Sequence, residues 1–407
     1  MGAILLPCTF DASSGPELGR LHAVRVRLVA QDRAAEVIGP PEGLLEEAGR
    51  RALASDQPLS FLNATPEAQA GEEGAGLRRA AAAYLEDRID EGAFGPVRDG
   101  IFLYRISVGG HEQTAVVADI HVDDYPGFVR PHERTLAERE EDLIAYLSEV
   151  GMTANPVTIA HRASMAVRSA LALVTERPPE LDLEVDGERH TVWEVPTELL
   201  AEVSAAFDQV DVTYVLDGHH RMAAARRHAH AVGATRADPA GRVLVAAIPD
   251  DELVVYPFHR WVDACWPDDG GAWHQGPPAG PDPTAAVVVT RAGWRRLPLE
   301  PREGELDVEA LERTVLGPIF GIHDARTDPR LEAIPGAEAT SAVCDRVELL
   351  GGTGILLHPP TPADLFAVAD RGGVVPPKST FFAPKPRSGI FLTDRRHPPA
   401  AYSRLQD

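Results

Sequence analysis

The sequence has little cysteine and no long apolar run, and each absence excludes a class of protein. Its three cysteines, Cys8, Cys265 and Cys344, lie too far apart for a Cys-x-x-Cys metal site or a disulfide framework. No run of about 18 apolar residues occurs, so no transmembrane helix is expected. The segment from Met1 to Cys8 lacks the basic and long apolar regions of a secretory signal. These features predict a cytoplasmic protein.

Positive charge is also scarce. Lys and Arg total 39 against 62 Asp and Glu, a formal net charge of −23. Such a surface repels phosphate backbones and anionic lipid, so we expect neither a nucleic acid nor a membrane partner. Any phosphate ligand must therefore be held by local groups.

The common nucleotide and metal signatures are missing. The sequence contains no Gly-x-x-x-x-Gly-Lys-Ser/Thr loop, no His-Glu-x-x-His pair and no protein-kinase signature set. A nucleotide-dependent enzyme with this sequence would therefore use none of those folds.

Strand and helix patterns mix along the 407 residues and predict an α/β protein with mixed sheets, in more than one domain. An Ala-rich pattern predicts a helix over 77–89, and apolar spacing predicts others over 136–150 and 161–174. We divide the chain into an N-terminal α/β segment, a nucleotide-binding core, a Gly/Pro/Asp-rich linker and a C-terminal α/β segment, which cover residues 1–125, 126–265, 266–283 and 284–407.

The strongest local signal is Asp217–Arg221, sequence Asp-Gly-His-His-Arg, where an apolar strand runs into a helix. The free N–H groups and dipole of a helix start suit an anion, and Gly218 permits close approach. Arg221 offers a fork for phosphate oxygens, Asp217 a ligand for Mg²⁺, and the His pair donors or metal ligands. The alternative is an Asp217 that only caps the helix beside partly buried histidines.

A second cluster is Pro131–Thr135, sequence Pro-His-Glu-Arg-Thr, just before a helix. Glu133 stands between His132 and Arg134, so we expect a lowered pKa and an ionised carboxylate ready to accept a proton. The alternative is a solvated helix start with an acidic first turn.

Two further clusters follow strands or stiff turns. His259 and Arg260 close an apolar strand, where sites on α/β sheets gather. The stretch 376–382, Pro-Pro-Lys-Ser-Thr-Phe-Phe, is rigid and basic and is followed by Pro-Lys-Pro. We expect Lys378 and its hydroxyl neighbours to fold back onto the core and complete an anion site. The alternative is a loop that the two phenylalanines merely anchor.

Together with Gly39-Pro40-Pro41, these motifs resemble a family of uncharacterised bacterial and archaeal proteins related to ParB, sulfiredoxin and the ADP-dependent free serine kinase. The resemblance runs over most of the chain and implies a ParB/sulfiredoxin-like core flanked by N- and C-terminal α/β segments. It departs from the small kinase in a longer gap between Glu133 and Asp217, in the large terminal segments, and in Glu42-Gly43 after the prolines, where Tyr-Asp is usual.

The resemblance implies a kinase that transfers a phosphoryl group from ATP or ADP, with Mg²⁺, to the hydroxyl of a free amino acid such as serine. Glu133 would be the base, Asp217 the organiser of metal and phosphate, and His220 a catalytic phosphate ligand. The other implied nucleotide or phosphate ligands are Gly218, His219, Arg221, His132, Arg134, Thr135, His259, Arg260, Lys378, Ser379 and Thr380.

Two other functions fit the same residues. One is a non-catalytic nucleotide-binding switch of the ParB type, which the negative net charge disfavours as a DNA clamp. The other is a metal hydrolase whose ligands come from the histidine-rich set His132, Glu133, His219, His220 and His259.

Overall fold

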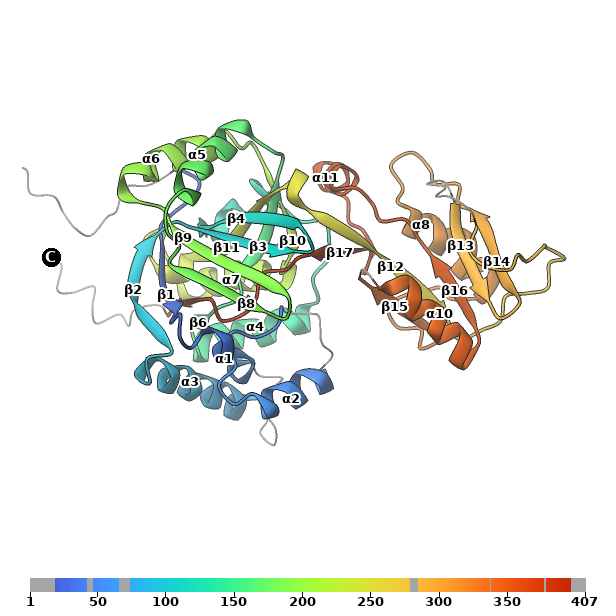
Figure 1. The fold of residues 1–407 in the computed structure, drawn as a ribbon, viewed down its shortest axis with the longest axis horizontal. Coiled ribbons are helices and arrows are strands. Elements are labelled where there is room, and N and C mark those ends of the chain that lie inside the picture. Colours follow the sequence, from blue (N-terminus) through green and yellow to red (C-terminus); the bar gives the residue numbers. More distant parts are fainter. Residues whose placement is uncertain are drawn as a thin grey trace, which may run out of the picture.

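The computed structural model describes residues 19–41, 47–65, 74–278, 285–336, 338–376 and 378–396. In these ranges the chain forms three sheets with helices between them, which confirms the mixed α/β fold class. Figure 1 shows a larger and a smaller lobe, joined by the long strand β12 (Val254–Val262). Cys8, Glu42, Gly43 and Pro377 lie outside the described residues.

The larger lobe is built on an eight-stranded sheet of order β5-β10-β7-β11-β4-β3-β9-β8. The strands are β3 (Phe102–Val108), β4 (His111–His121), β5 (Val129–Arg130), β7 (Val157–His161), β8 (Leu181–Val185), β9 (Glu188–Glu194), β10 (Thr213–Asp217) and β11 (Arg242–Pro249). Strands on both sides of residue 125 belong to this sheet, so the expected division at that residue falls inside it.

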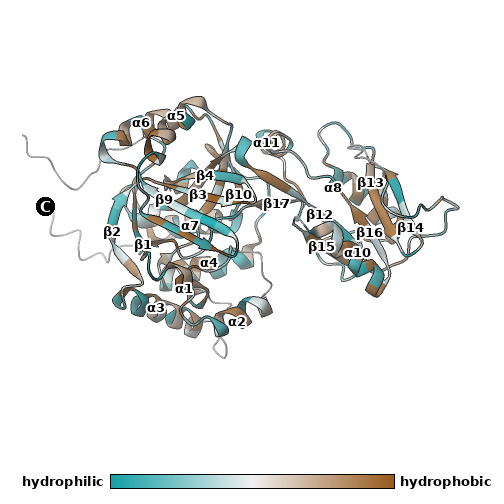
Figure 2. Cartoon of the chain, in the orientation of Figure 1, coloured by the Kyte–Doolittle hydropathy of each residue, from teal (hydrophilic) through white to brown (hydrophobic). Residues whose placement is uncertain are grey.

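Both faces of the central sheet are covered, which explains its continuous apolar strands. Successive residues of β4 alternate between two cores: Ala115 and Val117 pack in one, Val116 and Ala118 in the other. The first core includes residues of α3 (Ala75–Asp90) and of the second sheet. The second core includes α5 (Met165–Thr175), α6 (Thr197–Phe207) and α7 (His219–Val232). Figure 2 shows apolar residues along these inner strands.

One expected helix starts later than the sequence pattern indicated. Residue His161 ends strand β7, and α5 begins only at Met165. The Ser164 side chain accepts a hydrogen bond from the Val167 N–H and caps the helix. The apolar residues before this cap pack as a strand because both faces of the sheet are covered.

A four-stranded sheet, order β2-β1-β18-β6, lies beside the first core. Its strands are β1 (Val24–Val29), β2 (Phe94–Gly100), β6 (Met152–Thr153) and β18 (Phe391–Asp394), and α1 (Ala34–Val37), α2 (Glu47–Asp56) and α4 (Ala137–Glu149) belong to the same lobe. Strand β18 pairs with β1, so the end of the chain returns to its beginning. Just after β18, Arg395 forms two bonds of 2.7 and 2.5 Å to Asp119 of β4.

The smaller lobe is a sheet of order β14-β13-β16-β12-β15, with β17 also pairing to β12. Its other elements are β13 (Ala285–Thr290), β14 (Gly293–Pro298), β15 (Leu331–Pro335), β16 (Thr353–Leu356), β17 (Thr380–Ala383), α8 (Asp307–Leu311), the π-helical turn Glu312–Leu316, α9 (Gly317–Phe320), α10 (Ala339–Leu350) and α11 (Pro362–Asp370). Its core continues into the central sheet through Tyr214, Leu216 and Ala160, so the lobes are packed together.

The Asp119–Arg395 pair gives a test of how firmly the chain end is held. Both side chains are buried, at 3% and 6% exposure. Arg395→Met leaves Asp119 as an uncompensated buried charge, and we expect a loss of about 3–5 kcal/mol in unfolding free energy. The neighbouring Arg396 is half-exposed, so Arg396→Met should cost under about 1 kcal/mol. Chemical denaturation measures both, and equal losses would contradict the expectation.

Candidate functional site

The two principal motifs leave the same edge of the central sheet. Strands β5 and β10 are parallel neighbours, and Tyr214 pairs in register with Arg130. Glu133 follows Arg130, and Asp217 follows Tyr214, by the same number of residues. Parallel strands in register send their continuations out at one edge, so the long sequence gap between the motifs is closed by the sheet.

Asp217, the last residue of β10, is bonded through both carboxylate oxygens. Its Oδ2 accepts from Arg221 at 2.7 Å, and its Oδ1 accepts from Lys385 at 2.8 Å. Burial alone would raise the pKa of Asp217, but Lys385 and Arg221 outweigh it and lower that pKa. Arg221 also donates to the carbonyls of Asn155 and Pro156, at 2.8 and 2.7 Å. Its guanidinium therefore fixes the position of Asp217.

Gly218 makes the turn between Asp217 and helix α7. Its φ of +94° lies in the left-handed region, and an added Cβ would come within 2.9 Å of the Arg221 guanidinium. That guanidinium is held by three bonds, so a larger residue would disturb both the turn and the Asp217 pair. The turn lets α7 start directly behind the carboxylate, where first-turn N–H groups have no partner within the helix.

Lys385 reaches the site from the chain's last strands. It is mostly buried, and its ammonium lies 5.2 Å from the ring centre of Phe381. Gln113 donates to the Pro384 carbonyl at 3.0 Å, and Arg387 pairs with Glu188 at 3.1 Å, so the segment is fixed on both sides of the lysine. Sequence reasoning did not select Lys385. One signal was present: the chain has only two lysines, Lys378 and Lys385, among 39 basic residues.

The structure places Lys385, not Lys378, on Asp217. The Lys378 side chain is exposed, and its carbonyl accepts from Arg260 at 3.0 Å. Ser379 donates to the Pro376 carbonyl at 2.5 Å, and Thr380 pairs with Pro257 in the β12–β17 ladder.

His259 and Arg260 are used within the smaller lobe. His259 contacts Thr340 at 3.0 Å through Nε2 and accepts from the Leu357 N–H at 3.2 Å through Nδ1. Burial lowers the pKa of His259 to about 4, so the ring is neutral near pH 7. Arg260 is fully buried and donates to the carbonyl of Phe258 at 3.0 Å. These contacts are local to β12 and its neighbours.

The two histidines of the Asp-Gly-His-His-Arg motif hold the loop that carries Glu133. His219 Nε2 accepts from the His132 N–H at 3.5 Å, and His220 Nε2 accepts from the Leu136 N–H at 3.0 Å. The rings of His132 and His219 meet edge to face, 4.7 Å apart. From the other side, the Val375 N–H donates to the His132 carbonyl at 2.8 Å. The loop is clamped between α7 and the C-terminal segment.

Burial keeps the buried histidines neutral. It lowers the pKa of His132 to about 4, and burial, with His132 adding to it, lowers the pKa of His219 well below the ordinary value. Because His219 Nε2 accepts a hydrogen bond, the proton of the neutral ring sits on Nδ1. That nitrogen lies 3.9 Å from the Glu133 carboxylate.

The pKa of Glu133 is raised, the opposite of the direction expected from its charged neighbours in sequence. Burial is the main cause, and the negative charge of Asp217 adds to it against Arg139, Arg326 and Lys385. The adjacent cation Arg134 is exposed, and the expected lowering fails because the folded carboxyl leaves water and faces Asp217. Thr135 is half-buried, and its hydroxyl bonds to Glu140.

Three separate parts of the sequence line a small pocket at Asp217. Gly39 donates to the Ser388 carbonyl at 2.9 Å, and Ser388 donates to the Pro40 carbonyl at 3.3 Å, which brings the Gly-Pro-Pro motif here. The lining residues are Pro41, Asn155, Pro156, Thr158, Asp217, Arg221, Lys385, Pro386 and Ser388.

A larger pocket of about 430 Å³ lies in the smaller lobe. Glu312 lines it, and burial raises the pKa of this carboxyl. Arg326, next to the lining residue Ala325, exerts its charge on both Glu312 and Glu133. The two lobes therefore face each other electrostatically across this region.

The site does not fit a metal on Asp217 as it stands, because Lys385 and Arg221 occupy both carboxylate oxygens. Across the described ranges, no group of three or more His, Cys, Asp or Glu side chains is arranged to hold a metal ion. The histidine-rich metal centre is not assembled either, since His259 is engaged in the smaller lobe.

The fold and site define a two-lobed α/β protein whose sheet edge combines a buried acid–base pair with a raised-pKa carboxyl. A family model described as protein of unknown function (DUF1015) matches residues 23–269, more than half of the chain. The chain belongs to this family. A comparison with curated proteins found no match. Among the described residues, no helix is long and apolar enough to cross a membrane.

Solved structures with low similarity include three named proteins. A free serine kinase in complex with AMP is 14% identical, with a TM-score of 0.35, and the match covers 67% of this chain and 91% of that one. SbnI with C-terminal truncation from Staphylococcus aureus is 13% identical, with a TM-score of 0.37 and coverages of 67% and 85%. A conserved hypothetical protein from Pyrococcus furiosus is 14% identical, with a TM-score of 0.33 and coverages of 68% and 93%.

The Lys385–Asp217 contact can be tested through the carboxyl it controls. Replacing Lys385 by Met removes the strongest group that lowers the Asp217 pKa and leaves the burial that raises it, so that pKa should rise. Carbon-13 NMR titration of labelled aspartate carboxyls measures the change. Lys378→Met is the matched control and should leave the Asp217 titration unchanged. A rise in both variants, or in neither, would place the controlling charge elsewhere.

Proposed function

We propose that this protein is a phosphotransferase that moves a phosphoryl group from ATP or ADP to the hydroxyl of a small amino acid. The observation that carries the proposal is the placement of Lys385 on Asp217 at the start of α7, with the half-buried Glu133 beside the same helix start. Phosphoryl transfer needs positioning and charge neutralisation more than covalent chemistry, and both are what this arrangement supplies.

The phosphate end of the proposed site consists of Lys385 and the first turn of α7. An ammonium and a helix N-terminus both stabilise phosphate oxygens. Asp217 and Arg221 act as supports: the carboxylate holds the lysine, and the guanidinium holds the carboxylate. No step is assigned to a metal on Asp217, because both of its oxygens are bonded to cations.

The acceptor end consists of Glu133. Its carboxylate takes the proton of the substrate hydroxyl while the hydroxyl oxygen bonds to phosphorus, and the bond from phosphorus to the leaving nucleotide oxygen breaks. The products are a phosphate ester and ADP or AMP. A raised pKa suits this base, since a base works best when its pKa is near the operating pH. His219 and His220 hold the loop that carries it.

The acceptor class comes from the motif resemblance to the free serine kinase, and serine is its first candidate. The charged pocket around Glu312 in the smaller lobe suits a small polar acceptor, because Arg326 acts electrostatically on both that pocket and Glu133. The nucleotide-switch alternative shares the phosphate end and differs in needing no base.

A matrix of nucleotides and amino acids tests the reaction. With ATP or ADP and serine, phosphorus NMR should show a new phosphomonoester and loss of the donor. Glu133→Gln should lower turnover by about 100-fold or more and leave nucleotide affinity nearly unchanged, because the base acts only in transfer. Wild-type turnover should rise with pH as the Glu133 carboxyl loses its proton at a raised pKa. Nucleotide binding without transfer to any acceptor would favour the switch, and full activity in Glu133→Gln would remove Glu133 as base.

The scarcity of lysine allows a direct test of the phosphate end. Reductive methylation with carbon-13 formaldehyde keeps the charge and labels only Lys378, Lys385 and the amino terminus. Added ADP should shift the Lys385 signal and leave the Lys378 signal in place. Lys385→Met should weaken nucleotide binding by about 1–3 kcal/mol, with Lys378→Met as the control. A nucleotide that binds without moving the Lys385 signal would show that the phosphates lie elsewhere.

A further inference from the structure

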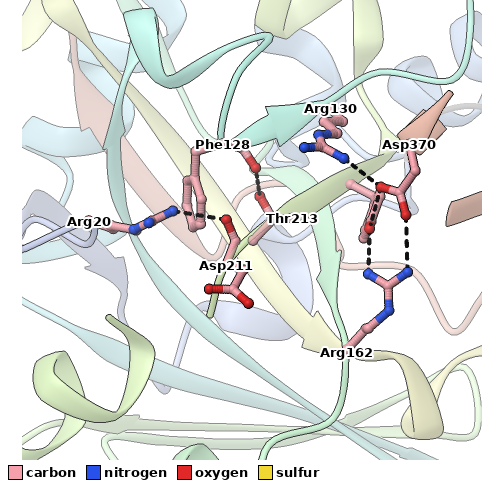
Figure 3. Close-up of polar contacts among 8 residues, drawn as sticks. Arg20, Phe128, Arg130, Arg162, Asp211, Thr213 and Asp370 are labelled. Carbon is pink, nitrogen blue, oxygen red and sulfur yellow. Dashed lines mark hydrogen bonds and ion pairs between the residues drawn. The ribbon is translucent and has the colours of Figure 1, made fainter. Parts of the chain in front are cut away.

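Asp370, the last residue of α11, collects three donors from the central sheet (Figure 3). It accepts from Arg130 at 2.6 Å, from the Tyr214 hydroxyl at 2.8 Å and from Arg162 at 3.2 Å. Arg162 also donates to that hydroxyl at 2.5 Å. One carboxylate therefore joins strands β5 and β10 and the end of β7 to a single helix end.

Aromatic stacking fixes the same helix end. Phe366 of α11 stacks on Tyr214 with ring centres 3.8 Å apart and planes 9° from parallel. The Arg162 guanidinium lies 5.4 and 5.5 Å from the centres of these two rings. A carboxylate at a helix C-terminus is opposed by the helix dipole, so Asp370 depends on the cations that surround it. Burial alone would raise its pKa, but Tyr214, Arg162 and Arg130 lower it.

The bonded residues occupy a special place in the sheet. Arg130 and Tyr214 are register partners in β5 and β10, the strands that continue to Glu133 and Asp217. Strand β5 has only two residues, so its ladder is short. Near it, Thr213 donates to the Phe128 carbonyl from its backbone at 2.8 Å and from its hydroxyl at 3.3 Å (Figure 3). A bridge from Asp370 to both register partners adds what this short ladder lacks.

The same segment continues to the catalytic loop. After α11 the chain passes Val375, whose N–H bonds to the His132 carbonyl, and then reaches β17 and Lys385. Displacement of the α11 end would therefore move both partners of the proposed site.

We propose that Asp370 is a positioning residue that fixes the relative height of the two strand ends, so that Glu133 and the Asp217–Lys385 pair face one substrate. This inference rests on the proposed phosphotransferase function. Asp370 touches neither substrate nor nucleotide and acts through Arg130 and Tyr214.

Asp370→Asn removes the charge and keeps the shape. We expect kcat to fall by roughly tenfold or more, because transfer is sensitive to misplacement of about 1 Å. ADP affinity, measured by calorimetry, should change by less than about twofold. Asp370→Glu should recover part of the loss. The matched control is Asp182→Asn, which breaks an exposed pair with Arg189 on β8–β9, at the far edge of the same sheet, and should change nothing.

A second readout needs no turnover. The His132 and Leu136 N–H groups bond to His219 and His220, and their hydrogen exchange reports whether the loop is held. Exchange at both should be faster in Asp370→Asn and unchanged in Asp182→Asn. If the wild-type protein transfers no phosphoryl group but exchange still rises, the proposed function fails and the positioning role stands. If turnover and exchange are both unchanged, the positioning role is overturned. Tyr214→Phe, which keeps the stack and removes one donor, carries the same test if Asp370→Asn does not fold.

Discussion

The ion pair between Lys385 and Asp217 is the contact on which the arrangement of the site depends. It joins residues 168 positions apart, and it forms only because the chain returns from the smaller lobe to the larger one. On this return, β17 pairs with β12, Arg387 pairs with Glu188, β18 pairs with β1 and Arg395 pairs with Asp119. Each contact limits the freedom of the next, so the lysine is held in place before any ligand binds. Such preorganisation lowers the entropy lost on binding.

Local charge opposes the overall charge at this sheet edge. The chain carries a formal net charge of −23, which disfavours anions at long range. Over the few ångströms of a binding site, however, two cations and a helix N-terminus dominate, because salt screens charges beyond about 10 Å. Asp217 offsets part of this positive charge and also fixes its position. The site can therefore accept an anion selectively without attracting polyanions to the whole surface.

The histidines illustrate how burial changes the meaning of a motif. In sequence, adjacent histidines beside a glycine and an arginine resemble a set of phosphate or metal ligands. In the fold, burial lowers the pKa of His219, and both histidines accept hydrogen bonds from the backbone of the Glu133 loop. Arg221 is likewise turned inward to two carbonyls and Asp217. The motif builds the frame of the site, while the group that faces the pocket alongside it, Lys385, comes from elsewhere in the chain.

The sequence by itself determined the α/β class, most of the strands and helices, and the strand-to-helix turn at Gly218, because these follow from local periodicity and from the backbone freedom of glycine. It also marked the motif at Pro376–Pro386 as basic and rigid. The tertiary structure decided which lysine reaches Asp217, since the two lysines have similar neighbours in sequence and differ only in where β17 sends them. It also decided the direction of the Glu133 pKa, which depends on burial and on Asp217 and not on the cations next to it in sequence. Both outcomes depend on distances between residues far apart along the chain, which local patterns do not contain.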